Sequence, residues 1–513
     1  MPPDMFLLKI FKRNMSGGIR KVRKDFKQKS IKKEDKITKR EEKIKGVMVL
    51  AFLAVAAGAF GFPALAQLID RTQNPNIGNF GIAKSLNQQI GTGRGDAMTP
   101  DSSAFIISRD PFRSIRRGRQ IFQRKFLRSQ GIGPLTNDSI GDINTNLAFG
   151  AGLTDSCASC HGRPRGSAGF GGDVTTRPDS RDAPHLFGLG IKEMLADEIT
   201  ADLRAIRADA VAQAQQTNQN VSRPLTSKGI NYGNIIARPN GTIDASNISG
   251  VNADLRVRPF FYHGDTTSIR EFVVGAFNDE MGLQAVDAEL MSAHDGARIV
   301  TPSGMSLDGS KDTVKPQPTD NPNADLDSDG ISNEIPAALV DHMEFYLLNY
   351  FKPATYEQTN ETRQGRRIFQ QIGCAQCHIS DLQINRDRRV ADVETVYDEE
   401  RGIFNNLFAT ATPLFNQVSD TTGYPSFKRP KLQPFLAENI FTDFKRHDLG
   451  PNFHERDYDG TIRTMFMTTP LWGSRFDFAL RTRRTQHHLE GCHLAARRRS
   501  ANSARGICQT FGK

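Results

Sequence analysis

Cysteine is scarce in this sequence, and its scarcity excludes a disulfide-stapled protein. Six cysteines occur among 513 residues. Four of them form two Cys-x-x-Cys-His motifs, at residues 157–161 and 374–378. The other two, Cys492 and Cys508, lie in a basic tail. Once the motifs are set aside, no even framework of paired cysteines remains.

The body of the chain also lacks an excess of positive charge, although the whole chain has a formal net charge of +10. Residues 1–46 hold 16 Lys and Arg against 6 Asp and Glu, and residues 481–513 hold 8 against 1. The residues between 47 and 480 therefore carry 43 basic and 50 acidic side chains, a net charge of −7. We expect no nucleic-acid partner, because such binding depends on neutralising phosphates.

Long apolar runs are absent apart from residues 47–62. This run follows the Lys/Arg-rich residues 1–46 and ends in Pro63-Ala64-Leu65-Ala66, which is typical of a signal-peptide cleavage site before Gln67. We therefore predict export to the periplasm. The alternative is an uncleaved membrane anchor, since residues 47–66 are just long enough to span a bilayer.

The remaining chain predicts a mainly α fold: two cytochrome c-like haem domains with small inserted β-hairpins and long loops. Helical periodicity marks residues 117–127, 191–215 and 337–351, and Pro239-Asn240-Gly241 is a hairpin-turn sequence. The pattern Gly-Arg-x-Ile-Phe-Gln occurs at residues 118–123 and again at 365–370, ahead of each motif. This repeat indicates two copies of one domain type. The predicted segments are 1–66 (basic region with signal or anchor), 67–107 (linker), 108–300 (first haem domain), 301–354 (calcium-loop linker and helix), 355–475 (second haem domain) and 476–513 (aberrant tail).

Cys-x-x-Cys-His is the attachment sequence of haem c. The two thiols add across the vinyl groups of the haem, and the adjacent histidine becomes an axial ligand of the iron. A thioredoxin-like dithiol would follow a strand, whereas both motifs here follow a predicted helix. A zinc site would need a second cysteine pair roughly 12–20 residues away, and these pairs are more than two hundred residues apart. We predict two covalent haems. Their attachment residues are Cys157, Cys160, His161, Cys374, Cys377 and His378.

The sixth ligand of each iron sets its potential and reactivity. For the first haem we favour Met281, which follows an amphipathic segment; an ordinary core methionine is the alternative interpretation. The rivals at the first haem are Met194, His185 and His263. For the second haem we favour Met467, and the alternatives are Met465 and His447.

Four segments together resemble the bacterial di-haem oxidoreductase family, which is similar in turn to the di-haem cytochrome c peroxidases. They are residues 156–163, 277–282, 447–451 and 469–473, and the resemblance covers about residues 108–475. It implies that a small redox protein exchanges electrons with one haem and that hydrogen peroxide is reduced at the other. It also implies a methionine ligand near the second haem, in favour of Met465 or Met467. For acid–base chemistry we can name Glu280 and Asp279, with solvated carboxylates as the alternative interpretation.

A calcium loop is predicted between the two motifs. Residues 325–334 read Asp-Leu-Asp-Ser-Asp-Gly-Ile-Ser-Asn-Glu, the oxygen-rich spacing of such a loop. The candidate ligands are Asp325, Asp327, Asp329, the carbonyl of Ile331, Asn333 and Glu334. The twelfth position is Pro336 in place of the usual Glu, so a solvated acidic turn is the alternative. The related peroxidases hold calcium between their haem domains.

The tail loses amphipathic order after Arg475. The family continues with a His-Asp-Gly-Arg turn and a His-Gly-Gly-Glu-Ala helix, and neither is present here. We interpret residues 476–513 as the product of a frameshift. We therefore assign no ligand role to Cys492, Cys508, His487, His488 or His493. The sequence thus favours a peroxidase-like di-haem oxidoreductase, with a non-catalytic di-haem electron carrier as the alternative and an inactive haem-binding product as a third possibility.

Overall fold

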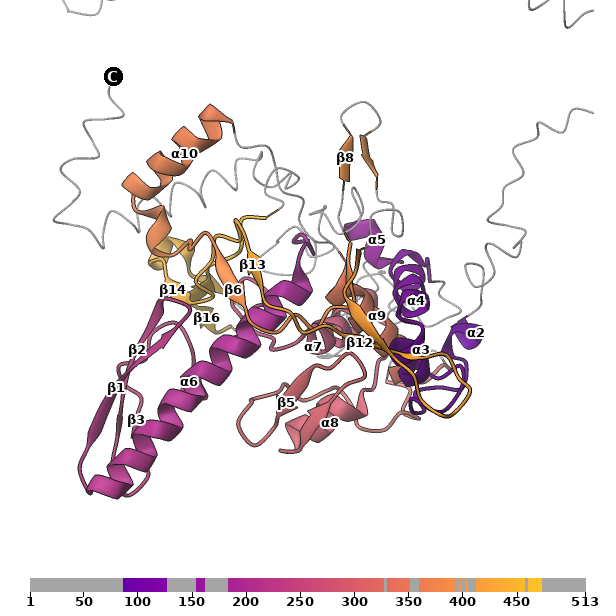
Figure 1. Cartoon of the computed structure of the whole chain (residues 1–513), viewed down its shortest axis with the longest axis horizontal. Helices are drawn as coiled ribbons and strands as arrows, with labels where there is room; N and C mark the ends of the chain where they lie inside the picture. The colour runs from indigo at the N-terminus through magenta and orange to yellow at the C-terminus, as the bar shows by residue number, and fades with distance from the viewer. Residues whose placement is uncertain are drawn as a thin grey trace, which may run out of the picture. The chain divides into compact units, whose positions relative to one another are not determined.

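The computed structural model describes residues 86–126, 154–161, 183–326, 330–350, 359–393, 396–398, 402–404, 412–456 and 460–472 (Figure 1). The chain divides into Met1–Asn74 and Pro75–Lys513, and every described residue belongs to the second unit. The apolar run at residues 47–62 and the tail at 476–513 lie outside the described residues. Within the described part of the chain, no helix has both the length and the apolarity that crossing a bilayer requires.

Helices dominate the first half of the described chain. They are α2 (Leu86–Ile90), α3 (Ser103–Arg109), α4 (Pro111–Gln123), α5 (Cys157–Cys160), α6 (Leu189–Thr217), α7 (Ile269–Gly275), the π-helix η4 (Ala276–Met281), α8 (Ala288–His294) and α9 (Ala337–Asn349). Helix α10 (Asn360–Gln371) and the 3₁₀ turns η5 (Cys374–Gln376) and η6 (Pro451–Phe453) follow in the second half. The predicted helices at 191–215 and 337–351 are confirmed, and the one predicted at 117–127 both begins and ends earlier, at Pro111 and Gln123.

Short antiparallel ladders make up the strands. The first half has the sheet of β1 (Val221–Ser227), β2 (Ile230–Ala237) and β3 (Ile243–Asp244), and the pair β4 (Arg298–Val300) with β5 (Ser306–Asp308). The second half has the pairs β6 (Leu382–Ile384) with β13 (Phe435–Ala437), β7 (Ala391–Asp392) with β10 (Thr412–Pro413), β8 (Val396–Asp398) with β9 (Gly402–Phe404), β11 (Phe415–Val418) with β12 (Phe427–Pro430), β14 (Arg446–Asp448) with β17 (Met465–Met467), and β15 (Glu455–Arg456) with β16 (Ile462–Arg463). The predicted turn at Pro239-Asn240-Gly241 joins β2 to β3. Helices and ladders both contribute, so the described residues show no clear class and the mainly α fold stays a prediction.

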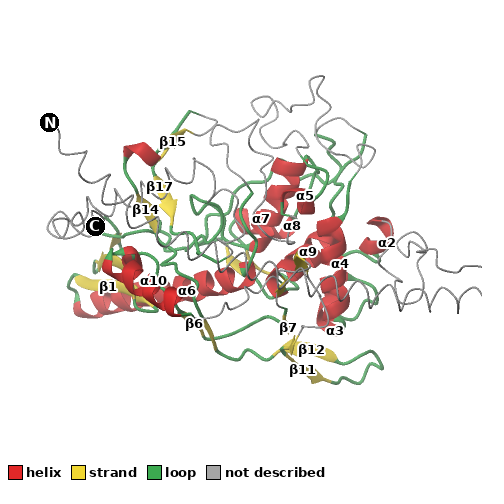
Figure 2. Ribbon diagram, turned by 90° about the horizontal axis from the view of Figure 1, so that it is seen from above, coloured by secondary structure: helices red, strands yellow, loops and turns green. Residues whose placement is uncertain are grey.

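Helices α4 and α9 pack closely in the first of two core clusters (Figure 2). Asp110 caps the start of helix α4, because its carboxylate accepts a hydrogen bond from the Arg113 amide. A Cβ at Gly118 would lie 2.2 Å from the carbonyl oxygen of His342 and 2.3 Å from Cβ of Tyr346. Glycine at this position therefore permits the close approach of the two helices.

Helix α6 lies along the β1–β2–β3 sheet and forms the second core cluster with it (Figure 1). This cluster also contains Leu382, Phe444 and Met467 from the far end of the chain. The two predicted haem domains, 108–300 and 355–475, therefore share a hydrophobic core in the structure.

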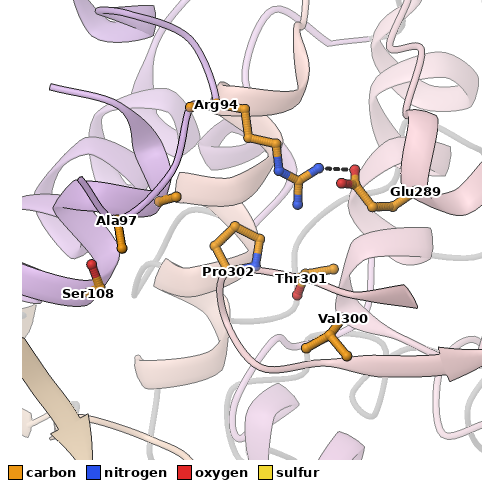
Figure 3. A pocket seen from close by; sticks show the side chains of 9 residues that line it. Arg94, Ala97, Ser108, Glu289, Val300, Thr301 and Pro302 are labelled. Carbon is orange, nitrogen blue, oxygen red and sulfur yellow. Dashed lines mark ion pairs between the residues drawn. The ribbon is translucent and has the colours of Figure 1, made fainter. Parts of the chain in front are cut away.

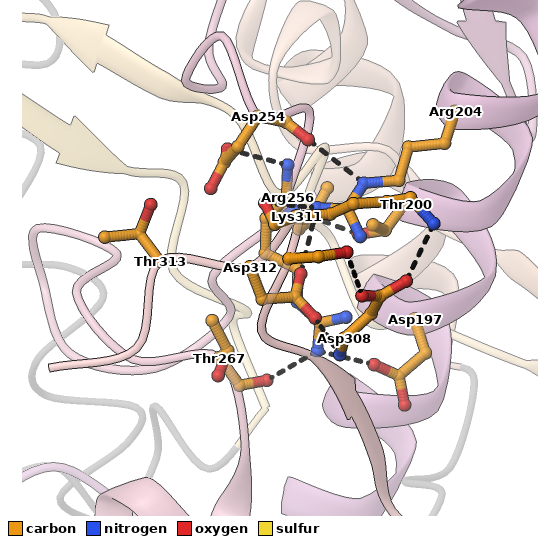
Figure 4. A network of polar contacts seen from close by, with 12 residues as sticks. Asp197, Thr200, Arg204, Asp254, Arg256, Thr267, Asp308, Lys311, Asp312 and Thr313 are labelled. Carbon is orange, nitrogen blue, oxygen red and sulfur yellow. Dashed lines mark hydrogen bonds and ion pairs between the residues drawn. The ribbon is translucent and has the colours of Figure 1, made fainter. Parts of the chain in front are cut away.

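A network of buried and half-buried ion pairs fixes the middle of α6 (Figure 4). Arg204 donates to the carbonyl of Asp254 at 3.0 Å and to the carboxylate of Asp312 at 2.9 Å. Arg256 donates to Asp197 on α6 at 2.7 Å. These contacts position the helix that begins beside the first motif.

Candidate haem sites

The first motif is held against the end of α4. The amide of Phe126 donates to the carbonyl of Asp155 at 2.8 Å, and the motif cysteines follow at once in α5. Cys157 and Ala158 pack against the first core cluster. Burial raises the pKa of the Cys157 thiol to about 12. A thiol held protonated in this way does not have the reactive thiolate of a thioredoxin-like dithiol.

His161 presents a neutral imidazole. Burial lowers the pKa of its ring to about 4, although the nearby carbonyl of Pro184 opposes this shift. Its Nδ1 atom is buried and has no hydrogen-bond partner among the described residues. Neutral imidazole is the form that binds a metal, so the residues of this motif fit the axial ligand and the thiols that a covalent haem requires.

The structure places Met281 at the first motif. Its Sδ atom lies 3.8 Å from Sγ of Cys157, although 124 residues separate the two in sequence. The side chain is 2% exposed and ends the π-helix η4. π-Helical turns are rare and occur frequently at functional sites.

The rivals of Met281 lie in different surroundings. Met194 packs in the second core cluster, where its sulfur accepts from the amide of Arg388 at 3.2 Å. His263 contacts Glu455 and the carbonyl of Met465. His185 is buried and stacked on Phe187.

The carboxylates suggested for acid–base chemistry differ in exposure. Asp279 is exposed and Glu280 is half-buried. Both belong to η4, immediately before Met281. They therefore lie next to the first motif's methionine in the chain, while the structure gives no observation that assigns either of them a catalytic role.

The second motif is held by residues 440–447, an irregular segment that leads into β14, through backbone hydrogen bonds. The amide of Ile440 donates to the carbonyl of Ser380 at 2.7 Å, and that of Thr442 to the carbonyl of Ile379 at 3.0 Å. In this arrangement Nδ1 of His378 lies 2.8 Å from the carbonyl of Phe441. A histidine whose Nδ1–H is fixed by a carbonyl has its Nε2 available for a metal. Cys374, Cys377 and His378 therefore also fit a covalent haem.

The same segment brings a buried histidine to the second motif. Nε2 of His447 lies 3.0 Å from Oδ2 of Asp443, and ligand atoms of Cys377, Asp443 and His447 all lie within 4.8 Å of one another. Burial opposes protonation of His447, but the hydrogen bonds and charges of Asp443 and Cys377 together outweigh it and raise the pKa to about 9. An iron bound by His447 would therefore have to displace the ring proton. Sequence reasoning missed Asp443, which has no motif of its own and contacts His447 because the backbone turns before β14, with a positive φ at Phe444.

The two methionines suggested for the second haem lie on β17. Met465 is 38% exposed, and Met467 is buried in the second core cluster. In the β14–β17 ladder His447 is opposite Phe466, so the methionines flank the position that pairs with His447. Of the three candidates, His447 is the one with a described contact to the attachment residues.

Hydrogen bonds join the predicted calcium loop to residues 284–286, which follow Met281 in the chain. Oδ2 of Asp325 accepts from the amide of Gly330 at 2.9 Å, and Gly330 has the positive φ of +89° that the sharp turn requires. Asn333 accepts from the amide of Val286 at 2.9 Å, and Glu334 from that of Gln284 at 2.6 Å. Ile331 lies in the same loop, whereas Asp327 and Asp329 lie outside the described residues.

A pocket of about 340 Å³ is lined by residues outside both motifs (Figure 3). Arg94 and Glu289 form an ion pair across it, and Thr301 and Pro302 form part of its wall. None of the predicted haem, calcium or catalytic residues lines it.

Comparison with known proteins gives no relative for this chain. No family model, curated protein or solved structure matches it.

Proposed function

We propose that the chain is an exported di-haem c-type cytochrome that transfers electrons between its haems and reduces hydrogen peroxide. The observation that supports it most is the contact between Met281 and Cys157, because it joins an attachment thiol to a sulfur ligand from a remote helix. Bound haem supplies one-electron redox chemistry whose potential follows from its axial ligands. The resemblance to the di-haem oxidoreductases supports the peroxide as substrate.

The chain's own residues have separate roles in this proposal. Each cysteine thiol adds across a vinyl group, so that one C–S bond forms and the thiol hydrogen moves to the other vinyl carbon. His161 and His378 would each supply an imidazole ligand to a haem iron, and Met281 would supply a thioether ligand to the first. A small redox protein supplies two electrons, and with two protons these convert one peroxide to two waters.

The calcium loop supports the first site in this proposal. Asn333 and Glu334 hold the amides of Val286 and Gln284, only a few residues after Met281. A cation bound by Asp325 and its neighbours would therefore order the segment that presents Met281. Periplasmic export and a structural calcium both remain parts of the proposal.

A non-catalytic electron carrier is the second candidate. A ligand candidate at each motif, Met281 at the first and His447 at the second, favours it, because two six-coordinate irons leave no site for peroxide. The carrier would have the same haems and the same redox partner. The two candidates differ only in whether one iron binds and reduces peroxide.

Optical and EPR spectra of the purified, calcium-loaded protein test the proposal in the oxidised and half-reduced states. A high-spin iron that reacts with hydrogen peroxide would support the peroxidase-like enzyme. Two low-spin irons that ignore peroxide in every redox state would leave the electron carrier. Purified protein that carries no haem at the first motif and none at the second would contradict both candidate functions.

A further inference from the structure

Lys192 is a buried lysine near the first motif, and none of the described residues supplies a counter-charge to it. Lys192 on α6 is 5% exposed, and among the described residues its ammonium group makes no hydrogen bond or ion pair. Burial lowers its pKa to about 8, and no carboxylate of the described residues offsets the shift. Lys228 is nearly as buried, but its ammonium pairs with Glu198 at 2.6 Å. Because burial of an unpaired charge is strongly unfavourable, the contrast suggests that Lys192 meets an anion from outside the chain.

Lys192 lies in the first turn of α6. The helix begins after Gly188, which provides no side-chain hydrogen bond to the free amides of that turn. Helical side chains lean toward the N-terminus, so the Lys192 side chain covers this turn. The free amides and the ammonium group together attract negative charge.

A neutral histidine connects this turn to the first motif. Nδ1 of His185 is buried and has no hydrogen-bond partner among the described residues. Burial lowers the pKa of the His185 ring, nearby Lys192 and His161 lower it further, and the carbonyl of Pro470 opposes the shift. The first motif and Lys192 therefore share His185 as a common neighbour.

The backbone around this cluster has no room to move away. A Cβ at Gly190 would lie 2.1 Å from the carbonyl oxygen of Leu348, and one at Gly188 would lie 2.5 Å from the ring of Trp472. Helix α9 and the segment that ends at Trp472 thus hold the start of α6 from two sides. A rigid arrangement of donors is suited to one anion in one position.

We propose that Lys192 and the first turn of α6 form an anion site that binds a carboxylate, namely a propionate of the haem attached at the first motif. The inference rests on the proposed function, because the propionate arrives with the haem. A free carboxylate from solution has the same chemistry and is the competing source. The site thus gives α6 a role in setting the potential of the first haem.

Lys192→Met in the full chain tests this site, with Lys192→Arg as the conservative variant and Lys228→Met as the matched control. Mass spectrometry of proteolytic fragments first shows whether each motif has its haem. We expect Lys192→Met to retain both haems and to lower the midpoint potential of the first, since removing a nearby positive charge stabilises the oxidised iron relative to the reduced one. Lys192→Arg should restore the potential, and Lys228→Met should leave it unchanged.

A background that lacks only the first haem gives the opposite expectation and a second readout. In Cys157→Ala/Cys160→Ala protein, Lys192 has no propionate, so Lys192→Met should raise the urea midpoint of unfolding. Acetate should raise the midpoint of this background but should not change the potential of the haem-loaded protein. Attached haem with an unaltered potential in Lys192→Met would overturn the propionate site and leave the proposed function intact. Absence of haem from the wild-type chain would instead overturn the proposed function.

Discussion

The sulfur of Met281 lies 3.8 Å from the thiol sulfur of Cys157. Met281 is the last residue of the π-helix η4, which continues α7, and Cys157 is the first residue of α5. Packing in the first core cluster brings them together. The contact makes Met281 the leading candidate for the sixth ligand of the first iron.

Met281→Leu should therefore convert the first haem to a high-spin or altered low-spin form and lower its midpoint potential, because the thioether raises that potential. Met194→Leu is the matched control, since this methionine is also 2% exposed but packs in the second core cluster. EPR and optical spectra of both variants make the comparison. Identical spectra of Met281→Leu and wild type would show that another group binds the iron.

His447→Ala should change the spectrum of the second haem, whereas Met467→Leu should leave it unaltered. His447 shares the second site with Cys377 and is oriented by Asp443, while Met467 packs in the second core cluster. Asp443→Asn should weaken the effect of His447 without removing it, because the carboxylate only fixes the ring. Optical and EPR spectra measure all three variants. A spectrum that changes in Met467→Leu but not in His447→Ala would instead support Met467, the ligand that the sequence favours.

Gly118→Ala should destabilise the fold by about 1–3 kcal/mol, because overpacking a close helix contact forces the backbones apart. Gly365 of α10 is the matched control, because it occupies the same position in the second copy of the Gly-Arg-x-Ile-Phe-Gln pattern. An added Cβ at Gly365 would have no neighbouring atom within 4 Å. Gly365→Ala should stabilise the helix by about 1 kcal/mol. Urea unfolding of both variants measures the two free energies. Equal effects would contradict the packing difference between the repeats.

Calcium should raise the thermal midpoint of the protein, and a chelator should reverse the increase. Asp325→Ala should abolish the response, because Asp325 opens the predicted loop and closes it on Gly330. Asp308→Ala is a suitable control, since Asp308 pairs with Lys311 outside the loop. Differential scanning fluorimetry with calcium and with magnesium measures the response. A response that persists in Asp325→Ala would exclude this loop as its source.

The Cys157→Ala/Cys160→Ala protein, which lacks the first haem, should gain stability as the pH rises from about 8 toward the pKa of an unfolded lysine, near 10.4. The folded state lowers the pKa of Lys192, so the unfolded state binds more protons over this range and loses its advantage as the pH rises. His185 and His161 face this region, but burial lowers the pKa of both, so they are already neutral. The gain should be about 3 kcal/mol and absent in Lys192→Met. Urea titrations at a series of pH values measure it, and a flat profile in the parent protein would contradict an unpaired ammonium.

The sequence by itself determined the local features of this protein. The spacing of Cys157, Cys160 and His161 defines an attachment motif wherever the chain folds, because the three residues are neighbours. The periodicity of residues 191–215 and the turn at Pro239-Asn240-Gly241 likewise depend on short-range preferences, and the structure confirms both.

Only the tertiary structure decided which distant groups meet. Met281 reaches Cys157 through helix packing, and Asp443 reaches His447 through a turn of the backbone that no motif marks. The two Gly-Arg-x-Ile-Phe-Gln copies are alike in sequence, yet Gly118 packs closely against α9, whereas Gly365 has no neighbouring atom that an added Cβ would meet. Lys192 is the clearest case, because a lysine within a helix gives no sign in sequence that folding will bury it. Such contacts depend on burial and close packing between segments far apart in the chain, and residue spacing does not encode them.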